Sequence, residues 1–148
     1  MLRNFSWLIE DEIAGMGRPL TLAEDLFLLK KKKINTIVSL TEKSLDKDVI
    51  ANSGFSYLHL PIVDFSVPSF EQIDAFLDFV SNPDRNNKKI VLHCESGFGR
   101  TGTMLCIYLV KLKGYTADDA IRTVRMKRPG SVETPNQEAR VFEFEKLI

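Results

Sequence analysis

The sequence predicts an α/β fold, with a central, mostly parallel sheet flanked by helices in one domain over residues 1–148. Short apolar, β-branched runs alternate with amphipathic segments that begin at helix-capping residues. The chain of 148 residues shows no internal repeat or linker, and this length suits one hydrophobic core. Hydrophobic residues make up 44 % and charged residues 27 %, as in ordinary globular proteins.

The first half of the chain is predicted to contain two helices and two strands. Thr21 and Glu24 match a capping box that opens the first helix. Residues 34–40, INTIVSL, form a buried β-branched strand. A short helix near residues 46–52 and a strand at 55–60, FSYLHL, continue the alternation.

The second half is predicted to contain one strand and four helices. Ser69 and Gln72 match a capping box that opens a helix running to about Val80. Residues 89–93, KIVLH, form a strand, and the helix at 100–113 stops at the glycine that follows it. The last two helices begin at capping residues, one at Thr116 with Asp119 and the other at Thr134 with Pro135 and Gln137. The helix that begins at Thr116 ends before Pro129.

Charge and hydropathy restrict the expected partners and location. Lys and Arg together number 20, as do Asp and Glu, so the chain has no net cationic field for nucleic acid or an anionic membrane. No apolar run approaches the ~20 residues that span a bilayer. Acidic residues occur at the amino terminus, where a signal peptide needs its apolar stretch. We expect a monomer in the cytoplasm, with access to the nucleus left open, and no nucleic-acid or membrane partner.

The cysteines and histidines do not have the spacing of a metal site. Cys94 and Cys106 are too few for a disulfide framework, and His59 and His93 lie far apart in the sequence. We therefore expect no metal and no other cofactor. Cys106 is expected to be a core residue, with a redox partnership with Cys94 as the alternative, and His59 is expected to be a strand residue.

Residues 91–102, VLHCESGFGRTG, place a reactive pattern at a strand-to-helix junction. The strand leads into Cys94, and Gly97 and Gly99 allow the loop to turn its amides inward. The helix that follows is apolar on every face, so we expect it to be buried and to hold its amino terminus in place. Free N–H groups at that terminus attract an anion, and Arg100 can bind two phosphate oxygens. The loop is therefore predicted to bind a tetrahedral oxyanion.

Cys94 is expected at the mouth of this anion site. A helix amino terminus and a neighbouring cation lower the pKa of a cysteine from about 8.5 to roughly 3.5–7.5, which produces the nucleophilic thiolate. Thr101 is placed to donate its hydroxyl to that thiolate. A lone cysteine after a strand is more often a small core residue. The coincidence with two glycines, an arginine and a threonine favours the nucleophile.

HCESGFGRTG at residues 93–102 resembles the H-C-x5-R-[ST]-G signature of the cysteine-dependent protein tyrosine phosphatases. IVSLTE, LPIVDFSVPSFEQID and RPGSVET also resemble segments of this superfamily, so the likeness covers nearly the whole chain. The resemblance is strongest to the small atypical dual-specificity phosphatases of the VHZ type. It implies a protein tyrosine phosphatase-like fold and a phosphocysteine intermediate, formed without a metal in a phosphate-binding loop (P-loop).

The resemblance also implies roles for individual residues. Cys94 is the nucleophile, Arg100 binds the phosphate, and His93 orients the loop and tunes the thiolate. Asp64, in PIVDFSVPS, is the general acid. Its alternative is a turn carboxylate that accepts a hydrogen bond from its own backbone. The other residues expected to bind the substrate phosphate are Glu95, Ser96, Gly97, Phe98 and Gly99.

Two residues near the carboxyl terminus are candidates for the hydrolytic step. Gln137 occupies the place where related enzymes position the attacking water. Thr134 and Gln137 also match a capping box, and the sequence favours neither interpretation. Glu133 is a candidate base, with a solvated surface carboxylate as the favoured alternative.

Two basic groups are expected to be structural, with recruitment of an anionic partner as the less favoured alternative. The run from Lys30 to Lys33 ends a predicted helix, where cations suit the helix dipole. The second group consists of Arg125, Lys127 and Arg128.

The implied reaction is hydrolysis of phosphorylated protein substrates, with phosphotyrosine as the target and phosphoserine and phosphothreonine left open. The loop's variable positions include the acidic Glu95, which argues against polyphosphorylated inositides. Phe65 and Phe98 are expected to form an aromatic wall. One alternative is a non-catalytic, phosphate-recognising binding module. The other is an RNA 5′-triphosphatase, for which we expect a more basic surface.

Overall fold

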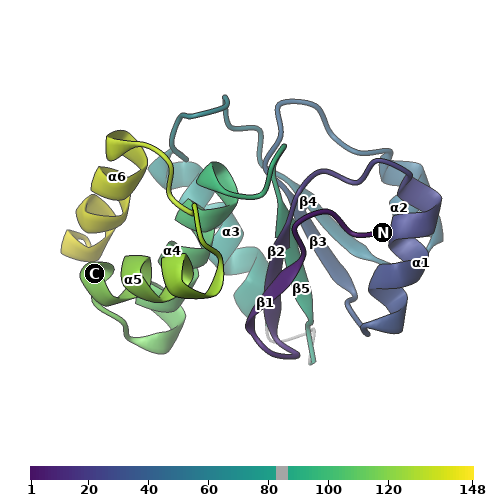
Figure 1. Ribbon diagram of the computed structural model, residues 1–148, viewed down its shortest axis with the longest axis horizontal. Coiled ribbons are helices and arrows are strands. Elements are labelled where there is room, and N and C mark those ends of the chain that lie inside the picture. The colour runs from purple at the N-terminus through teal and green to yellow at the C-terminus, as the bar shows by residue number, and fades with distance from the viewer. Residues whose placement is uncertain (83–86) are drawn as a thin grey trace.

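The computed structural model describes residues 1–82 and 87–148, which contain a five-stranded sheet (Figure 1). Its strands are β1 (Ser6–Ile9), β2 (Ile13–Met16), β3 (Thr36–Ser39), β4 (Ser56–His59) and β5 (Ile90–His93). Their order across the sheet is β1-β2-β5-β3-β4. β1 is antiparallel to β2, and the other neighbouring pairs are parallel. The predicted central, mostly parallel sheet is confirmed.

Helices cover both faces of this sheet. They are α1 (Leu22–Lys31), α2 (Lys47–Asn52), α3 (Phe70–Ser81), α4 (Gly99–Lys113), α5 (Ala117–Lys127) and α6 (Pro135–Lys146). α1 and α2 lie on one face and α3 to α6 on the other (Figure 1). Two apolar clusters fill the two interfaces, one around Leu29 and Ile37 and the other around Phe76 and Leu105. None of the described helices is long and apolar enough to cross a membrane.

The central strand β5 determines which loops meet at one edge of the sheet. Its last residue, His93, lies beside Met16 of β2 and Ser39 of β3 in the register of the parallel pairs. The carboxyl ends of three strands therefore lie together. Ligands of open α/β sheets bind at this edge, and the loop over residues 94–99 begins there.

α4 is the buried helix that its sequence predicts. Residues 99–110 are all buried, and only its last turn reaches solvent. α4 packs against α5 and α6 and against β2 and β5. Gly114 ends the helix in the left-handed region, at φ 72°, which confirms the predicted stop. The burial holds the amino terminus of α4 in a fixed position under the loop.

The structure differs from the sequence prediction at the amino terminus. The sequence predicts no strand before residue 34, yet β1 and β2 form there with four residues each, too few to show a clear alternation. Thr21 precedes α1, but its side chain makes no capping bond, and Glu24 instead lies 3.5 Å from the amino group of Met1. The capping box predicted at Thr21 is therefore wrong. The boxes that begin at Ser69 and Thr134 are confirmed.

Candidate active site

Cys94 follows β5 directly and is 2 % exposed. Its sulfur accepts two hydrogen bonds, one from the backbone N–H of Gly97 at 3.3 Å and one from the hydroxyl of Thr101 at 3.1 Å. Donors aimed at sulfur stabilise its anionic form more than its neutral form. Thr101 thus makes the predicted contact, and two donors point at the sulfur.

Two glycines at the junction of β5 and α4 lie close to neighbouring residues, Gly97 in the loop and Gly99 at the start of α4. Gly97 has φ +89°, and a Cβ there would lie 2.7 Å from the backbone carbon of Met16. A Cβ on Gly99 would lie 2.4 Å from Oε1 of Glu133. Both distances are shorter than any ordinary carbon contact. A side chain at Gly97 would collide with backbone, so glycine is required there, whereas a side chain at Gly99 would meet the movable ends of the Glu133 and Gln137 side chains.

The amino terminus of α4 is free of side-chain caps. Phe98 occupies the N-cap position, and no side chain accepts from the first N–H groups. The first turn contains Arg100 and Thr101 and no acidic residue. Its N–H groups and the positive end of the helix dipole are therefore available to an external anion.

Arg100 is a buried cation held by two carboxylates and by two backbone carbonyls, of which that of Leu40 is the more distant at 3.5 Å. Its Nη1 lies 2.7 Å from Oε1 of Glu42 and donates to the carbonyl of Ile62, also at 2.7 Å. Its Nη2 lies 3.2 Å from Oδ1 of Asp64. The Nε–H is buried without a partner among the described residues. Arg100 therefore retains a donor for a further acceptor, although its own side chain is 2 % exposed.

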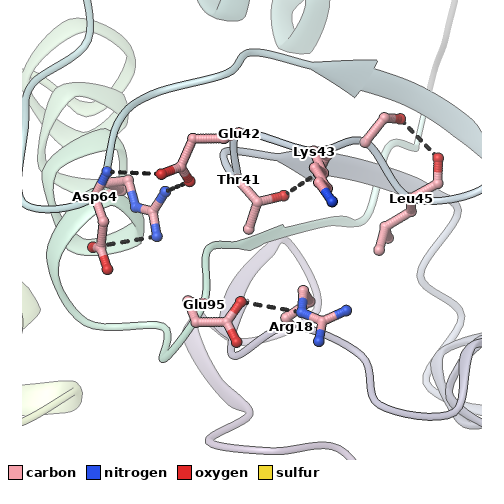
Figure 2. Close-up of a pocket in the computed structure, with 9 residues that line it drawn as sticks. Arg18, Thr41, Glu42, Lys43, Leu45, Asp64 and Glu95 are labelled. Atoms are coloured by element: carbon pink, nitrogen blue, oxygen red, sulfur yellow. Dashed lines mark hydrogen bonds and ion pairs between the residues drawn. The ribbon is translucent and has the colours of Figure 1, made fainter.

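Glu42 is a site residue that the sequence reasoning misses. Its Oε2 accepts a hydrogen bond from the backbone N–H of Asp64 at 3.3 Å, while Oε1 pairs with Arg100 (Figure 2). Its own backbone N–H and the Arg100 side chain lower the pKa of the Glu42 carboxyl. The sequence feature that could have identified Glu42 is its position just after β3, whose carboxyl end lies at the same sheet edge as that of β5.

The structure brings Asp64 to Arg100, on the loop that precedes α3. Its Oδ1 also accepts a hydrogen bond from the backbone N–H of Phe65 at 2.9 Å, and Phe65 has φ 65°. Asp64 therefore makes the backbone hydrogen bond expected of a turn carboxylate, in addition to its ion pair with Arg100. The side chain of Asp64 is 45 % exposed, so its carboxyl group also reaches solvent.

His93 is a neutral, buried histidine whose tautomer follows from its partners. Nδ1 lies 3.2 Å from the carbonyl of Cys94, which can only accept, so Nδ1 carries the proton. Nε2 then accepts from the hydroxyl of Ser39, which in turn accepts from the hydroxyl of Tyr57 at 2.7 Å. Burial lowers the pKa of His93 from 6.5 to about 4. The ring therefore orients the Cys94 carbonyl without carrying charge at neutral pH.

A cavity of about 650 Å³ opens beside Arg100 and Asp64. Glu42 and Asp64 lie together on one side of it, and the ion pair of Glu95 with Arg18, at 3.1 Å, lies on the other (Figure 2). The described residues that line it are Arg18, Thr41, Glu42, Lys43, Ser44, Leu45, Asp64, Glu95 and Arg100. Neither aromatic side chain expected as a wall is among them. Phe65 is exposed, and Phe98 lies against Gly130.

Gln137 and Glu133 approach the loop at Gly99. Oε1 of Gln137 accepts from the backbone N–H of Glu133 and of Thr134, at 2.8 and 3.2 Å, and the Thr134 hydroxyl accepts from Gln137 N, so the capping interpretation is confirmed. Nε2 donates to the carbonyl of Ser66 at 3.1 Å. The amide nitrogen carries a second hydrogen that these contacts do not use.

The residues with a structural interpretation are mostly placed as expected. Cys106 lies in the core, and burial raises its pKa to about 12. His59, on β4, donates from Nε2 to the carbonyl of Thr41 at 2.7 Å.

Arg125 and Arg128 donate to backbone carbonyls within the chain, and Arg128 is 2 % exposed. A docking role for Arg128 is therefore wrong. Residues 1–82 and 87–148 hold no group of three metal-ligating side chains.

Comparisons with known proteins agree with this geometry. Residues 14–114, more than half of the chain, match the family model Tc-R-P, described as a polymorphic toxin system DSP-PTPase phosphatase. The dual specificity protein phosphatase CDC14A of Mus musculus is 34 % identical over 146 residues, covering 90 % of this chain and 24 % of CDC14A. The tyrosine-protein phosphatase cdc-14 of Caenorhabditis elegans is 31 % identical, covering 90 % and 20 %. The chain thus spans about a quarter or less of these relatives.

Solved structures share the whole architecture. The crystal structure of Tk-PTP in the active form has a TM-score of 0.88 and 30 % identity, with all of both chains covered. PTPMT1 in complex with PI(5)P has a TM-score of 0.86 at 18 % identity, covering 97 % of this chain and 95 % of PTPMT1, which shows the fold alone. The expected protein tyrosine phosphatase-like fold is confirmed. Since the family model also spans the loop that carries Cys94 and Arg100, the chain belongs to the DSP-PTPase family of cysteine-dependent phosphatases.

Proposed function

We propose that this chain hydrolyses phosphorylated proteins, removing phosphate from phosphotyrosine and also from phosphoserine and phosphothreonine, through a phosphocysteine intermediate. One observation carries the proposal. The Cys94 sulfur accepts two hydrogen bonds at the amino terminus of a buried helix, whose first turn also supplies the Arg100 that pairs with Asp64. Cys94, Arg100 and Asp64 therefore lie close together, which supports their proposed roles as nucleophile, phosphate-binding cation and proton donor.

In the first half-reaction the Cys94 thiolate attacks phosphorus in line. The S–P bond forms as the P–O ester bond breaks, and the proton of the Asp64 carboxyl group passes to the leaving oxygen. Arg100 and the amides of residues 95–99 hold the three remaining phosphate oxygens, where charge is greatest in the transition state. Thr101 stabilises the sulfur as nucleophile and as leaving group.

In the second half-reaction water attacks the phosphocysteine. The S–P bond breaks, the water proton passes to the Asp64 carboxylate, and inorganic phosphate leaves with the thiolate restored. In the same proposal Gln137 positions the water, and Glu133 is the alternative base. Support comes from their approach to the loop, since both side chains lie against Gly99.

The substrate and location belong to the same proposal. CDC14A is named as a dual specificity protein phosphatase, and the cavity of about 650 Å³ beside Arg100 has room for a phosphorylated side chain. We place the enzyme in the cytoplasm as a monomer. Size-exclusion chromatography and cell fractionation test these two points.

The deciding experiment is hydrolysis of an aryl phosphate with EDTA present, comparing the unmodified chain with Cys94→Ser. We expect turnover only in the unmodified chain and radiolabelled phosphate trapped on Cys94. A folded protein that binds vanadate without turnover would replace the proposal by a phosphate-recognising module. Phosphate release from triphosphate-ended RNA, with none from phosphopeptides, would replace it by an RNA 5′-triphosphatase.

A further inference from the structure

The carbonyl oxygens of the P-loop, residues 94–99, are all held by donors from outside the loop. The donors to these six carbonyls, in order, are His93 Nδ1, Arg3 Nη2 with Arg18 N, Asn4 Nδ2, Arg128 Nη2, Gly102 N with Val132 N, and Thr103 Oγ1. A trans peptide directs its N–H opposite to its C=O. Each outward carbonyl therefore turns the next amide inward, toward the site of the phosphate.

Part of this set of donors comes from the amino-terminal segment. Arg3 donates to the carbonyls of Arg18, at 3.0 Å, and of Glu95, at 2.9 Å. Asn4 adopts φ 51° and donates from Nδ2 to the carbonyl of Ser96 at 3.1 Å. Residues that precede the first strand therefore contact the loop directly, although they lie 92 positions before it in the sequence.

Arg128 connects this segment to the loop through hydrogen bonds. Nη2 donates to the carbonyl of Gly97 at 2.7 Å. Nη1 donates to the carbonyls of Asn4 and Gly15, at 3.1 and 2.9 Å, and to the hydroxyl of Ser6 at 2.7 Å. One guanidinium thus connects the amino-terminal segment, β2 and the P-loop.

Arg128 has no carboxylate partner among the ion pairs of the described residues. Burial lowers the pKa of Arg128 to about 10, and the negative charge of Cys94 acts in the opposite direction. A buried cation without a counterion is costly. Cys94, whose charge offsets the effect of burial, and an anion bound in the loop are therefore the candidate counterions.

We propose that Arg128, with Arg3 and Asn4, is a positioning residue that holds the P-loop carbonyls outward, and that its charge stabilises anions bound in the loop. The proposal rests on the proposed function for its catalytic consequence, but anion binding tests it separately. Holding the loop requires a hydrogen-bond donor to the Gly97 carbonyl, whereas stabilising a bound anion requires a positive charge. A lysine side chain supplies a charge and part of the hydrogen bonding, and a methionine side chain supplies neither.

The experiment measures orthovanadate affinity of the unmodified chain, Arg128→Met and Arg128→Lys, with thermal unfolding of each. We expect Arg128→Met to weaken vanadate binding about 10- to 100-fold and Arg128→Lys to recover part of the loss. Arg122→Met is the matched control, because Arg122 lies on α5, the helix that ends at Arg128, in an exposed pair with Asp118. Wild-type vanadate affinity in folded Arg128→Met would overturn the proposal, even if its unfolding temperature falls.

A second variant keeps the test decisive if Arg128→Met does not fold. Arg3→Ala combined with Asn4→Gly removes two donors, and glycine keeps the left-handed backbone at position 4. We expect about 3- to 10-fold weaker vanadate binding in this folded variant, and unchanged binding would overturn the proposal. Vanadate binding without turnover in the unmodified chain would refute the proposed function while leaving this comparison valid.

Discussion

The buried guanidinium of Arg100 and the carboxylate of Glu42 form an ion pair with 2.7 Å between Nη1 and Oε1. The side chain of Arg100 is 2 % exposed and that of Glu42 is 53 % exposed, so the ion pair joins a buried cation to a carboxylate at the protein surface. The other oxygen of Glu42 accepts from the backbone N–H of Asp64 at 3.3 Å. One carboxylate thus contacts both the proposed phosphate-binding cation and the loop that carries the proposed acid.

Replacing Glu42 by alanine is expected to lower kcat on an aryl phosphate by about 10- to 100-fold, because Arg100 and the Asp64 loop lose a common anchor. Glu42→Gln should lose less, since it keeps one acceptor oxygen. Steady-state kinetics measure the effect. Glu71→Gln, an exposed change on α3, is the matched control. Equal kcat for Glu42→Ala and the unmodified chain would remove Glu42 from this role.

Replacing Asp64 by asparagine tests the general acid. The amide keeps the size of the side chain but has no proton to give to the leaving oxygen, so kcat on a substrate with a poor leaving group should fall by about 10²- to 10⁴-fold. A good leaving group should suffer less, and vanadate affinity should change little. Asp74→Asn, exposed on α3, is the control. A loss that is the same for good and poor leaving groups would contradict proton donation.

Local spacing was sufficient to predict the loop but not its supports. Gly97, Arg100 and Thr101 lie within one strand-to-helix junction, so their physical requirements can be inferred from neighbouring residues. Glu42 and Arg128 reach the site from 58 residues before Arg100 and 31 residues after Gly97. These residues reach the loop only in the folded protein, so no periodic pattern in the sequence predicts their contacts with it.

The predictions of helices and strands show the same contrast between local interactions and long-range contacts. The capping boxes at Ser69 and Thr134 formed because each uses residues within one helical turn. β2 forms by pairing with the distant β5, and β1 in turn pairs with β2, and their four-residue lengths hid both strands from sequence analysis. At Thr21 a long-range contact prevails, since Glu24 faces the amino group of Met1 instead of closing the box.

Removing the hydroxyl of Thr101 tests the hydrogen bond to sulfur. Thr101→Val keeps the shape of the fully buried side chain but leaves the Cys94 sulfur with one fewer donor. We expect kcat to fall by about 100-fold, the typical cost of one donor to a developing anion. Thr101→Ser retains the hydroxyl and should retain most of the activity. If Thr101→Ser and Thr101→Val lose activity equally, the methyl group rather than the hydroxyl matters.

The stability of the protein should depend on the protonation of His93. Its pKa is 6.5 in the unfolded chain and about 4 in the folded one. Between these values only the unfolded chain binds the proton, so the free energy of unfolding falls as pH drops from 6.5 to 4, by up to roughly 3 kcal/mol. Urea titrations of the unmodified chain and His93→Asn measure this slope. His93→Asn should be flatter than His59→Asn, and equal slopes in the two variants would disprove the assignment.

Gln137 and Thr134 share one capping box, which allows the cap to be separated from the proposed hydrolytic role. Thr134→Ala and Gln137→Ala each lose capping bonds, so each should destabilise the protein by about 1 kcal/mol. Only Gln137→Ala also removes the amide that lies against Gly99. We expect phosphoenzyme to accumulate in Gln137→Ala and not in Thr134→Ala, because hydrolysis of phosphocysteine slows while its formation does not. Rapid-quench measurement of the phosphoenzyme distinguishes the two, and equal hydrolysis rates would leave Gln137 with the helix cap as its function.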